Sequence, residues 1–330
     1  MKQYNYFFGV DISKKTVDIS LLHLQAMTHK KFNNDSNGMT ELMTWLKELQ
    51  VPFTQTLFCM EATGLYCYTL THFLATNDID VWVEHAINIK KATALARGKN
   101  DKVDSQRIAT YCSKNLDRLR LWKPVDATID KIKQLAGLRE RLVETQKRLL
   151  TPIDEFEDVG NIEMATLLRK TIKKSIQAIE TDLKSVEAKI IDIVNADDNL
   201  RKLYKIITSV IGIGFVTAIN LIIHTNGFTM LNDSRKLACY CWVAPFEYSS
   251  GTSIRGKTKV HYMANKKLKC NLHMASLSAV KLDVDLKIYY ERKVAEGKNK
   301  MSVLNAVKNK LLARVVACVN NQREYVKKVA

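Results

Sequence analysis

Short apolar runs separated by polar turns fill the first 124 residues of the chain. Runs of this length, bounded by turn residues, are typical of buried strands. We predict strands at 6–13, 16–22, 56–60 and 79–83, with one more beginning at 30–32. Apolar residues at helical spacing predict a helix capped by Ser36 or Asn37 and a second helix over 65–75. Three strands followed by alternating helix and strand predict a mixed α/β sheet with helices on its faces.

Further along the chain, the apolar spacing changes to that of long helices. Seven residues step alternately by four and three positions, namely Ile172, Ile176, Ile179, Leu183, Val186, Ile190 and Ile193. A heptad pattern over three repeats with β-branched residues along the seam predicts a coiled coil. Thr151-Pro152, and less strongly Gly160, indicate where two such helices separate. We interpret them as a coiled coil that also meets another subunit, the alternative being a helical hairpin packed on its own chain.

An uncharged run of eighteen residues, 206–223, reaches the length at which a membrane helix has to be considered. Because it contains several small and polar residues, we predict no membrane span. Its Gly212 and Gly214 instead predict a tight turn between helices that resembles a helix-hairpin-helix core, in which the second helix offers free N–H groups to a phosphate. An ordinary helix–helix turn is the alternative. Further apolar patterns predict helices from Asn265 onward and through 304–316.

The charge of the chain is concentrated near its C-terminus. The net charge is +17, and residues 250–330 alone hold 18 Lys and Arg against 5 Asp and Glu. This balance predicts a polyanionic partner, nucleic acid rather than a membrane. A length of 330 residues suits two or three domains, and a hydrophobic content of 46% excludes a disordered chain. We expect domains at 1–124, 125–198 and 199–330, the last being basic and mainly helical.

The seven cysteines are scattered, odd in number and without a CxxC pair. This usage is typical of a reducing cytoplasm and argues against a disulfide framework or a zinc ribbon. We therefore expect a cytoplasmic protein.

Four acids stand where strands and helices begin or end. Asp11 lies inside the first apolar run, and Glu61 ends the strand at 56–60. Asp101 and Asp104 are three residues apart at a helix start, so both project from one side of its first turn. A buried carboxylate needs a compensating cation or donor, so the sharper interpretation is a shared divalent metal. Turn capping for Asp11 and helix-dipole stabilisation for the others are the alternatives.

A polar segment, Tyr248-Ser249-Ser250-Gly251-Thr252-Ser253-Ile254-Arg255-Gly256-Lys257-Thr258-Lys259, follows an apolar stretch that ends at Pro245. Small residues and three cations predict a loop suited to holding phosphates. We expect nucleic-acid contacts from Ser253, Arg255, Lys257, Lys259, Lys266, Lys267 and Lys269. Without further information, a phosphate-contacting loop that performs no chemistry is the alternative.

Three motifs resemble the DEDD signature of the "one-ten" family of insertion-sequence transposases. They are Gly9-Val10-Asp11-Ile12-Ser13-Lys14-Lys15, Met60-Glu61-Ala62-Thr63-Gly64 and Asn100-Asp101-Lys102-Val103-Asp104. The family includes bridge-RNA-guided recombinases and Piv-type DNA invertases. The resemblance implies a RuvC-like N-terminal domain of the ribonuclease H superfamily, with the four acids as ligands of Mg²⁺, or alternatively Mn²⁺.

The same resemblance covers the polar segment, because the family's nucleophilic serine lies in a tyrosine-x-serine-glycine motif. That position is Ser250, and the adjacent Ser249 does not occupy the nucleophile position of the motif. The family usually has proline where Ile211 stands, so the glycine turn is expected to be looser here. The resemblance implies a bacterial, nucleoid-associated recombinase that acts on DNA as a homo-oligomer with a structured guide RNA. A metal-dependent nuclease or junction resolvase without a covalent intermediate, and a non-catalytic nucleic-acid-binding relative, are the alternatives.

Overall fold

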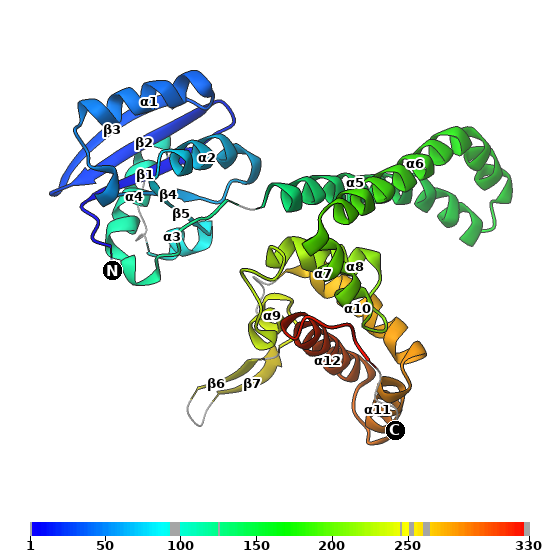
Figure 1. The fold of residues 1–330 in the computed structure, drawn as a ribbon. Helices are drawn as coiled ribbons and strands as arrows, with labels where there is room; N and C mark the ends of the chain where they lie inside the picture. The colour runs from blue at the N-terminus through cyan, green and yellow to red at the C-terminus, as the bar shows by residue number, and fades with distance from the viewer. Residues whose placement is uncertain are drawn as a thin grey trace. The chain divides into compact units, whose positions relative to one another are not determined.

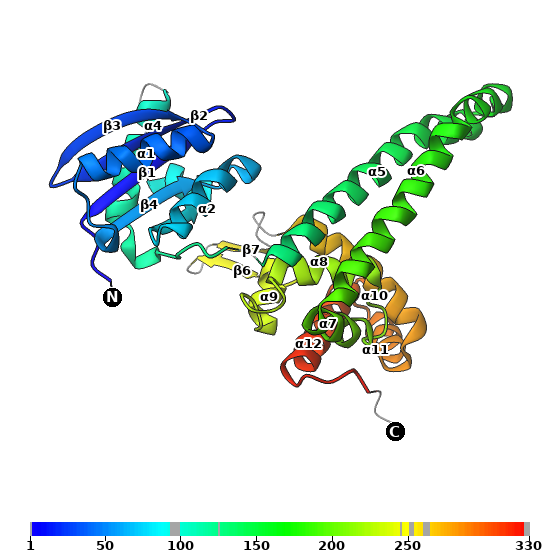
Figure 2. The ribbon, with the colours of Figure 1, turned by 45° about the horizontal axis from the view of Figure 1, so that its top comes forward.

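The computed structural model describes residues 2–92, 100–124, 126–244, 246–250, 254–259 and 265–326, and for 246–250 and 254–259 it describes the backbone alone. The chain divides into two compact units, residues 1–124 and residues 125–330 (Figures 1 and 2). The first unit is α/β and the described part of the second is mainly helical. The predicted fold class, α/β followed by α, is confirmed at this level.

The first unit is built on a five-stranded mixed sheet. Its strands are β1 (Tyr6–Ile12), β2 (Thr16–His23), β3 (Ala26–Asn33), β4 (Thr56–Glu61) and β5 (Asp80–Glu84). The spatial order is β3-β2-β1-β4-β5, with antiparallel pairing among the first three and parallel pairing of β1 with β4 and of β4 with β5. Strand β3 begins earlier than the predicted 30–32, because its whole length pairs with β2 across a tight turn.

Helices cover both faces of this sheet (Figure 1). On one face, α1 (Ser36–Glu48) and α2 (Tyr68–Thr76) pack on the apolar side chains of alternate strand residues. On the other face lie α3 (Ala86–Ala92) and α4 (Asp101–Lys114). The prediction that Ser36 or Asn37 caps α1 is wrong, because the carboxylate of Asp35 accepts the hydrogen bond from the Gly38 N–H at 2.9 Å. Short 3₁₀ turns lie at Phe53–Gln55, Gly64–Cys67 and Leu116–Arg118.

The second unit begins with a hairpin of two long helices, α5 (Ala127–Asp158) and α6 (Ile162–Ala196). The prediction that the helices separate at Thr151-Pro152 is wrong: Pro152 lies inside α5, and the chain turns at Gly160, where φ is +79°. A proline costs a helix one hydrogen bond. Here the neighbouring Ile153 is 1% exposed, so its packing holds the helix in place.

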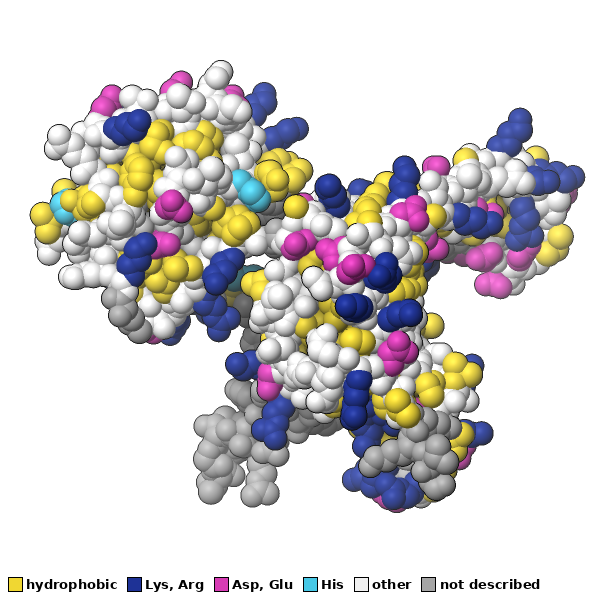
Figure 3. Space-filling model, in the orientation of Figure 1, with side chains coloured by type: hydrophobic (Ala, Val, Ile, Leu, Met, Phe, Trp, Pro, Cys, Tyr) yellow, Lys and Arg dark blue, Asp and Glu magenta, His cyan; other side chains and the backbone are white. Residues whose placement is uncertain are grey.

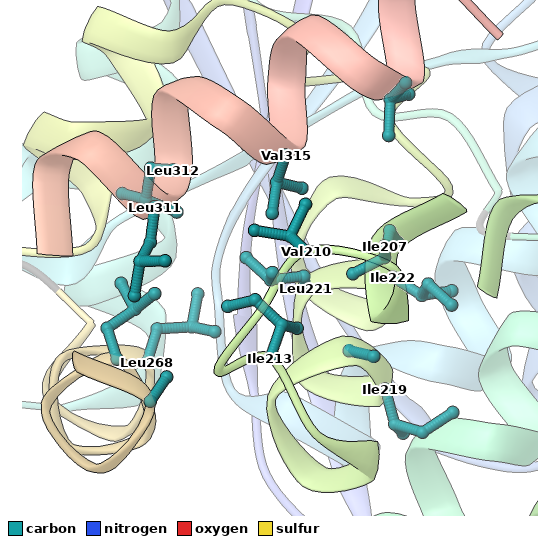
Figure 4. Close-up of a cluster of buried hydrophobic side chains, with 14 of the residues drawn as sticks. Ile207, Val210, Ile213, Ile219, Leu221, Ile222, Leu268, Leu311, Leu312 and Val315 are labelled. Carbon is teal, nitrogen blue, oxygen red and sulfur yellow. The ribbon is translucent and has the colours of Figure 1, made fainter. Parts of the chain in front are cut away.

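The remaining helices form a body with one large core (Figure 4). They are α7 (Asp198–Thr208), α8 (Phe215–Thr225), α9 (Ser234–Tyr240), α10 (Lys266–Leu282), α11 (Val284–Ala295) and α12 (Lys300–Asn320). Between α9 and α10, the strands β6 (Phe246–Ser250) and β7 (Ile254–Lys259) pair as a two-stranded sheet. Figure 3 shows Lys and Arg side chains on the described surface of this unit, interspersed with acidic ones.

The apolar run 206–223 is divided between α7 and α8 by the predicted glycine turn. Gly212 has φ +95°, and a Cβ there would lie 2.7 Å from the carbonyl oxygen of Ala275. A side chain therefore fits neither the backbone conformation nor the packing on α10. In the described part of the chain, no helix is long and apolar enough to cross a membrane.

Candidate functional site: an acid cluster and a serine hairpin

The strands of the first unit place Asp11 and Glu61 on the same face of the sheet. Strands β1 and β4 run parallel, with Val10 opposite Met60. Val10 and Met60 belong to the core on the α1–α2 side, so the next residue on each strand points to the α4 side. The side-chain alternation of two parallel strands thus brings two acids from distant segments to one edge.

Helix α4 brings the other two acids to this edge because Gly9 lets it approach β1 closely. A Cβ on Gly9 would overlap the backbone nitrogen of Ala109 and the backbone oxygen of Ser105. The contact is reinforced by the buried hydroxyls of Ser20 and Ser105, which are 2.8 Å apart. At the start of α4, the Asn100 side chain accepts a hydrogen bond from the Val103 N–H at 2.8 Å. The first turn of α4 contains Asp101 and Asp104.

The electrostatics of Asp11 show that the acids affect one another. Burial, followed by the charges of Asp101, Asp104, Glu61 and Asp18, raises the pKa of Asp11 to about 6. Each of these acids disfavours the ionised form of Asp11, as nearby like charges do. The other three predicted acids therefore lie close enough to Asp11 to raise its pKa.

A fifth carboxylate, Asp18, was missed by the sequence interpretation. It lies directly opposite Asp11 on β2 and is 4% exposed. Its partners are His29 Nε2 at 2.9 Å and Lys31 Nζ at 3.1 Å, both from β3. The available signal was the alternation of the strand at 16–22, which places Asp18 on the same face as Ser20 rather than in solvent.

Two of the acids have a basic neighbour of their own. Asp104 Oδ1 lies 2.8 Å from Arg107 Nη1, one turn along α4. Asp101 Oδ2 lies 3.7 Å from Lys31 Nζ, which also contacts Asp18. Lys31 therefore joins the buried Asp18 to the exposed start of α4.

The donor set fits a hard divalent cation, because all four predicted ligands are carboxylates and their repulsion favours a positive charge among them. Their side chains are not arranged as a coordination sphere. Across the described residues, no group of three or more His, Cys, Asp or Glu side chains is placed so that it could hold a metal ion. Binding would require the carboxylates of Asp101 and Asp104 to turn from their basic neighbours.

The polar segment that contains the predicted nucleophile is not the loop we expected, because part of it forms a hairpin. In its backbone, Ser250 at the end of β6 pairs with Ile254, and Ser249 pairs with Arg255. Lys257 and Lys259 continue along β7. Ser253 lies outside the described residues.

The base of this hairpin is closed by contacts among α8, α9 and α10. The backbone N–H of Asn265 donates to the carbonyl of Tyr240 at 2.9 Å. The His224 ring lies between them, with Nδ1 3.2 Å from the Tyr240 hydroxyl and 3.2 Å from Asn265 Nδ2. Burial, and then the charges of Lys267 and Lys133, lower the pKa of His224, which keeps the ring neutral at pH 7. Tyr240 and Asn265 thus meet, while Cys241 and Val243 between them remain in the helical core.

The predicted nucleic-acid contacts on α10 differ in their surroundings. Lys266 is exposed. Lys267 Nζ forms an ion pair with Glu140 on α5 at 2.7 Å, and Lys269 Nζ lies 4.3 Å from the centre of the Trp242 ring. Two of the three lysines are therefore already engaged within the protein.

Comparisons with known proteins cover nearly the whole chain. A sequence model of a family described as "Transposase" matches residues 8–156, and one described as "Transposase IS116/IS110/IS902 family" matches residues 204–291. The pilin gene-inverting protein of Moraxella bovis is 24% identical over 326 residues, which cover 98% of either chain. Its counterpart in Moraxella lacunata matches to the same extent. An insertion element IS110 protein of Streptomyces coelicolor is 29% identical over 134 residues, 41% of this chain and 32% of its own.

Proposed function

Because the chain belongs to the IS110 family of transposases and invertases, we propose that it cuts and rejoins DNA through a serine nucleophile, Ser250, assisted by Mg²⁺ at the acid cluster. Family membership makes it an enzyme of DNA recombination. The serine, the metal and RNA guidance are the finer parts of the proposal. The observation that carries it is the gathering of Asp101, Asp104 and Glu61 around Asp11, at positions of the family's acidic motif.

The acid cluster supports a RuvC-like organisation of the first unit. Two acids come from the ends of adjacent parallel strands and two from the start of a helix packed across them. Loops at the carboxyl ends of such strands are where open α/β sheets place their sites. When bound, Mg²⁺, or Mn²⁺ in its place, supplies positive charge that stabilises the developing charge on the phosphoryl oxygens.

In the proposed reaction, Oγ of Ser250 forms a bond to the scissile phosphorus while one phosphoester bond of the DNA strand breaks. The hydroxyl proton passes to a carboxylate of the acid cluster, and the leaving nucleotide oxygen takes a proton as it departs. Attack by a hydroxyl of another strand on the serine phosphodiester reverses these steps, so the strands are rejoined without hydrolysis.

The test is capture of the covalent serine–DNA adduct from the full-length protein with DNA and Mg²⁺. Ser250→Ala is expected to abolish the adduct, whereas the matched control Ser249→Ala keeps it. An adduct that survives Ser250→Ala would refute the serine assignment. Hydrolysis of DNA that continues unimpaired in Ser250→Ala would favour a nuclease that uses water as nucleophile.

The metal assignment is tested without the reaction, by thermal unfolding with and without Mg²⁺. A ligand that binds only the folded state raises its melting temperature. We expect Mg²⁺ to stabilise the wild-type protein, and expect Asp104→Asn to lose this shift while Asp117→Asn, on the 3₁₀ turn at Leu116–Arg118, retains it. Equal shifts in both variants would exclude Asp104 as a ligand.

We further propose that the chain works as a homo-oligomer with a structured guide RNA, with residues 125–198 providing the contact between subunits. Apolar side chains near the end of the α5–α6 hairpin support this, since Val159 is 77% exposed and Ile162 and Leu167 are each 57% exposed. Light scattering of the Leu167→Lys variant is expected to show a smaller particle than the wild type. Sequencing of the nucleic acid that copurifies with the wild type tests the guide RNA.

A further inference from the structure

A turn with large exposed side chains follows the candidate acid Glu61. The 3₁₀ turn Gly64–Cys67 connects the end of β4 to α2, and within it Leu65 is 74% and Tyr66 43% exposed. Single exposed apolar side chains are common on protein surfaces, so this exposure alone indicates no site. What distinguishes the turn is how firmly it is held beside the candidate acids.

Local hydrogen bonds tie this turn to the end of β4. The Thr63 N–H donates to Cys67 Sγ at 3.2 Å, and the Thr63 hydroxyl lies 2.9 Å from the same sulfur. The Cys67 thiol in turn donates to the Glu61 carbonyl oxygen at 3.4 Å, and the cysteine side chain is buried. The turn is therefore fixed to the residue that carries one of the candidate metal ligands.

Asn34 ties the same turn to the end of β1. Its Nδ2 donates to Tyr66 O at 3.0 Å and to Ser13 O at 3.1 Å. Its backbone N–H donates to Lys15 O at 2.8 Å. Ser13 follows Ile12, the last residue of β1, so one asparagine joins the β1–β2 turn to the turn after β4. Because β1 and β4 are parallel, both turns lie at the edge of the sheet where the candidate acids lie.

The two joined turns present complementary chemistry. Lys14 and Lys15 are exposed in the β1–β2 turn, and Leu65 and Tyr66 are exposed in the other. We call these four side chains the edge surface. Ammonium groups contact the phosphates of a nucleic-acid strand, and an aromatic ring stacks on an unpaired base. A purely apolar protein partner would leave both ammonium groups unused, so a nucleic-acid strand fits the edge surface better.

We propose that the edge surface binds one unpaired nucleotide of a DNA strand beside the phosphate that is cut. Lys14 and Lys15 contact the phosphates on either side of this nucleotide, and the Tyr66 ring stacks on its base with Leu65 alongside. Asn34 contacts no DNA and is a positioning residue that holds the two turns together. The choice of DNA rests on the proposed function, whereas the joining of a cationic turn to an aromatic one does not.

Binding of a short single-stranded DNA to the full-length protein, followed by fluorescence anisotropy with and without Mg²⁺, tests the ring. Tyr66→Ala is expected to weaken binding about tenfold, whereas Tyr66→Phe keeps the ring and binds as the wild type does. The matched control is Leu24→Ala, because Leu24 is 86% exposed in the β2–β3 turn at the opposite edge of the sheet. Unchanged binding in Tyr66→Ala, an equal loss in Leu24→Ala, or a loss confined to an RNA strand of the same sequence would overturn the proposal.

The salt dependence of the same binding tests the two lysines. Each phosphate contact to a single strand contributes about 0.7 to the slope of log K against log salt. The double variant Lys14→Ala, Lys15→Ala is therefore expected to reduce the slope by about 1.4. Lys114→Ala, an exposed lysine in the last turn of α4, is expected to keep the wild-type slope. An unchanged slope in the double variant would remove the lysines from the site.

The positioning role of Asn34 is tested by a double-variant cycle. Asn34→Ala keeps every group that contacts DNA but separates the two turns, so the loss caused by Tyr66→Ala is expected to fall to about threefold in this background. An equal loss in both backgrounds would contradict the role of Asn34. All of these measurements report binding at equilibrium. They therefore stand even if Ser250→Ala leaves the covalent adduct intact and the serine mechanism fails.

Discussion

Two candidate acids lie on central strands of a five-stranded sheet and two at the start of α4, which packs against it, whereas Ser250 lies at the end of a two-stranded sheet between α9 and α10. In the first unit, the position of Asp11 depends on a helix packed directly against β1 at Gly9. In the second unit, the serine hairpin is fixed where Asn265 meets Tyr240 and His224. The acids are thus positioned by strands and a helix of the core, whereas the serine lies beyond Val243, the last core residue before its hairpin.

The largest difference in stability is expected at the buried aspartates, of which the described part of each unit has one. In the second unit, Asp283 is 1% exposed, pairs with Arg314 at 2.6 Å and caps α11. Arg314→Met leaves that carboxylate without its cation and is expected to cost about 4 kcal/mol of unfolding free energy. Urea unfolding measures this loss. Recovery of most of it in the double variant Arg314→Met, Asp283→Asn would assign the cost to the uncompensated charge, and a cost that remains would contradict it.

The second comparison makes a Gly→Ala substitution in each unit. Gly9→Ala places a methyl group on the backbone of α4 and is expected to cost about 3 kcal/mol, since the helix has to move away from β1. Gly137→Ala, inside α5, meets only the Arg141 side chain at 3.6 Å and is expected to stabilise by about 1 kcal/mol. Chemical denaturation measures both changes in the free energy of unfolding. Because the acids move with α4, Gly9→Ala should also lose the Mg²⁺-dependent rise in melting temperature; retention of that rise would separate the acid cluster from the packing at Gly9.

Removal of Lys31 is the corresponding test at Asp18 in the first unit, and we expect a smaller loss of stability than for Arg314→Met. Asp18 keeps His29 as a partner when Lys31 is removed, and the lysine side chain is 50% exposed. Lys31→Met is therefore expected to lower the free energy of unfolding only slightly. The acid cluster becomes more negative, so Mg²⁺ should bind more tightly, which calorimetry measures. Weaker Mg²⁺ binding would instead make Lys31 a support for the ligand geometry of Asp101.

The smallest effect concerns the base of the serine hairpin. The pKa of His224 is lowered in the folded state, so the unfolded chain binds the extra proton first as the pH falls below about 6.5. Its contribution to stability is complete above that pH and is lost progressively below it. His224→Gln is expected to flatten the fall in unfolding free energy between pH 7 and 5, which urea unfolding at several pH values measures. A slope equal to that of the wild type would mean that His224 does not titrate as described.

The sequence predicted the parts of the site that depend on local pattern. The apolar pattern predicted the two strands that carry Asp11 and Glu61 and the helix start that carries Asp101 and Asp104, because period-two patterning determines which side chains share a face. It missed Asp18, whose position depends on pairing with β1 and β3, and it missed the hairpin β6–β7, whose short strands contain mostly polar residues. Pro152 misled the prediction of the helix break, because the packing of Ile153 outweighs the local cost of the proline.

The closed base of segment 241–264 has a consequence for how such proteins can be altered. Where two chain ends meet at one backbone hydrogen bond, doubling the length of the intervening loop costs only about 0.6 kcal/mol of closure entropy. The stretch bearing the serine can therefore be exchanged: a longer or shorter counterpart from a relative can be grafted between Ala244 and Asn265, which leaves Cys241 and Val243 in the core of the second unit. Chimaeras joined at these two residues would exchange the serine segment of one protein for that of another.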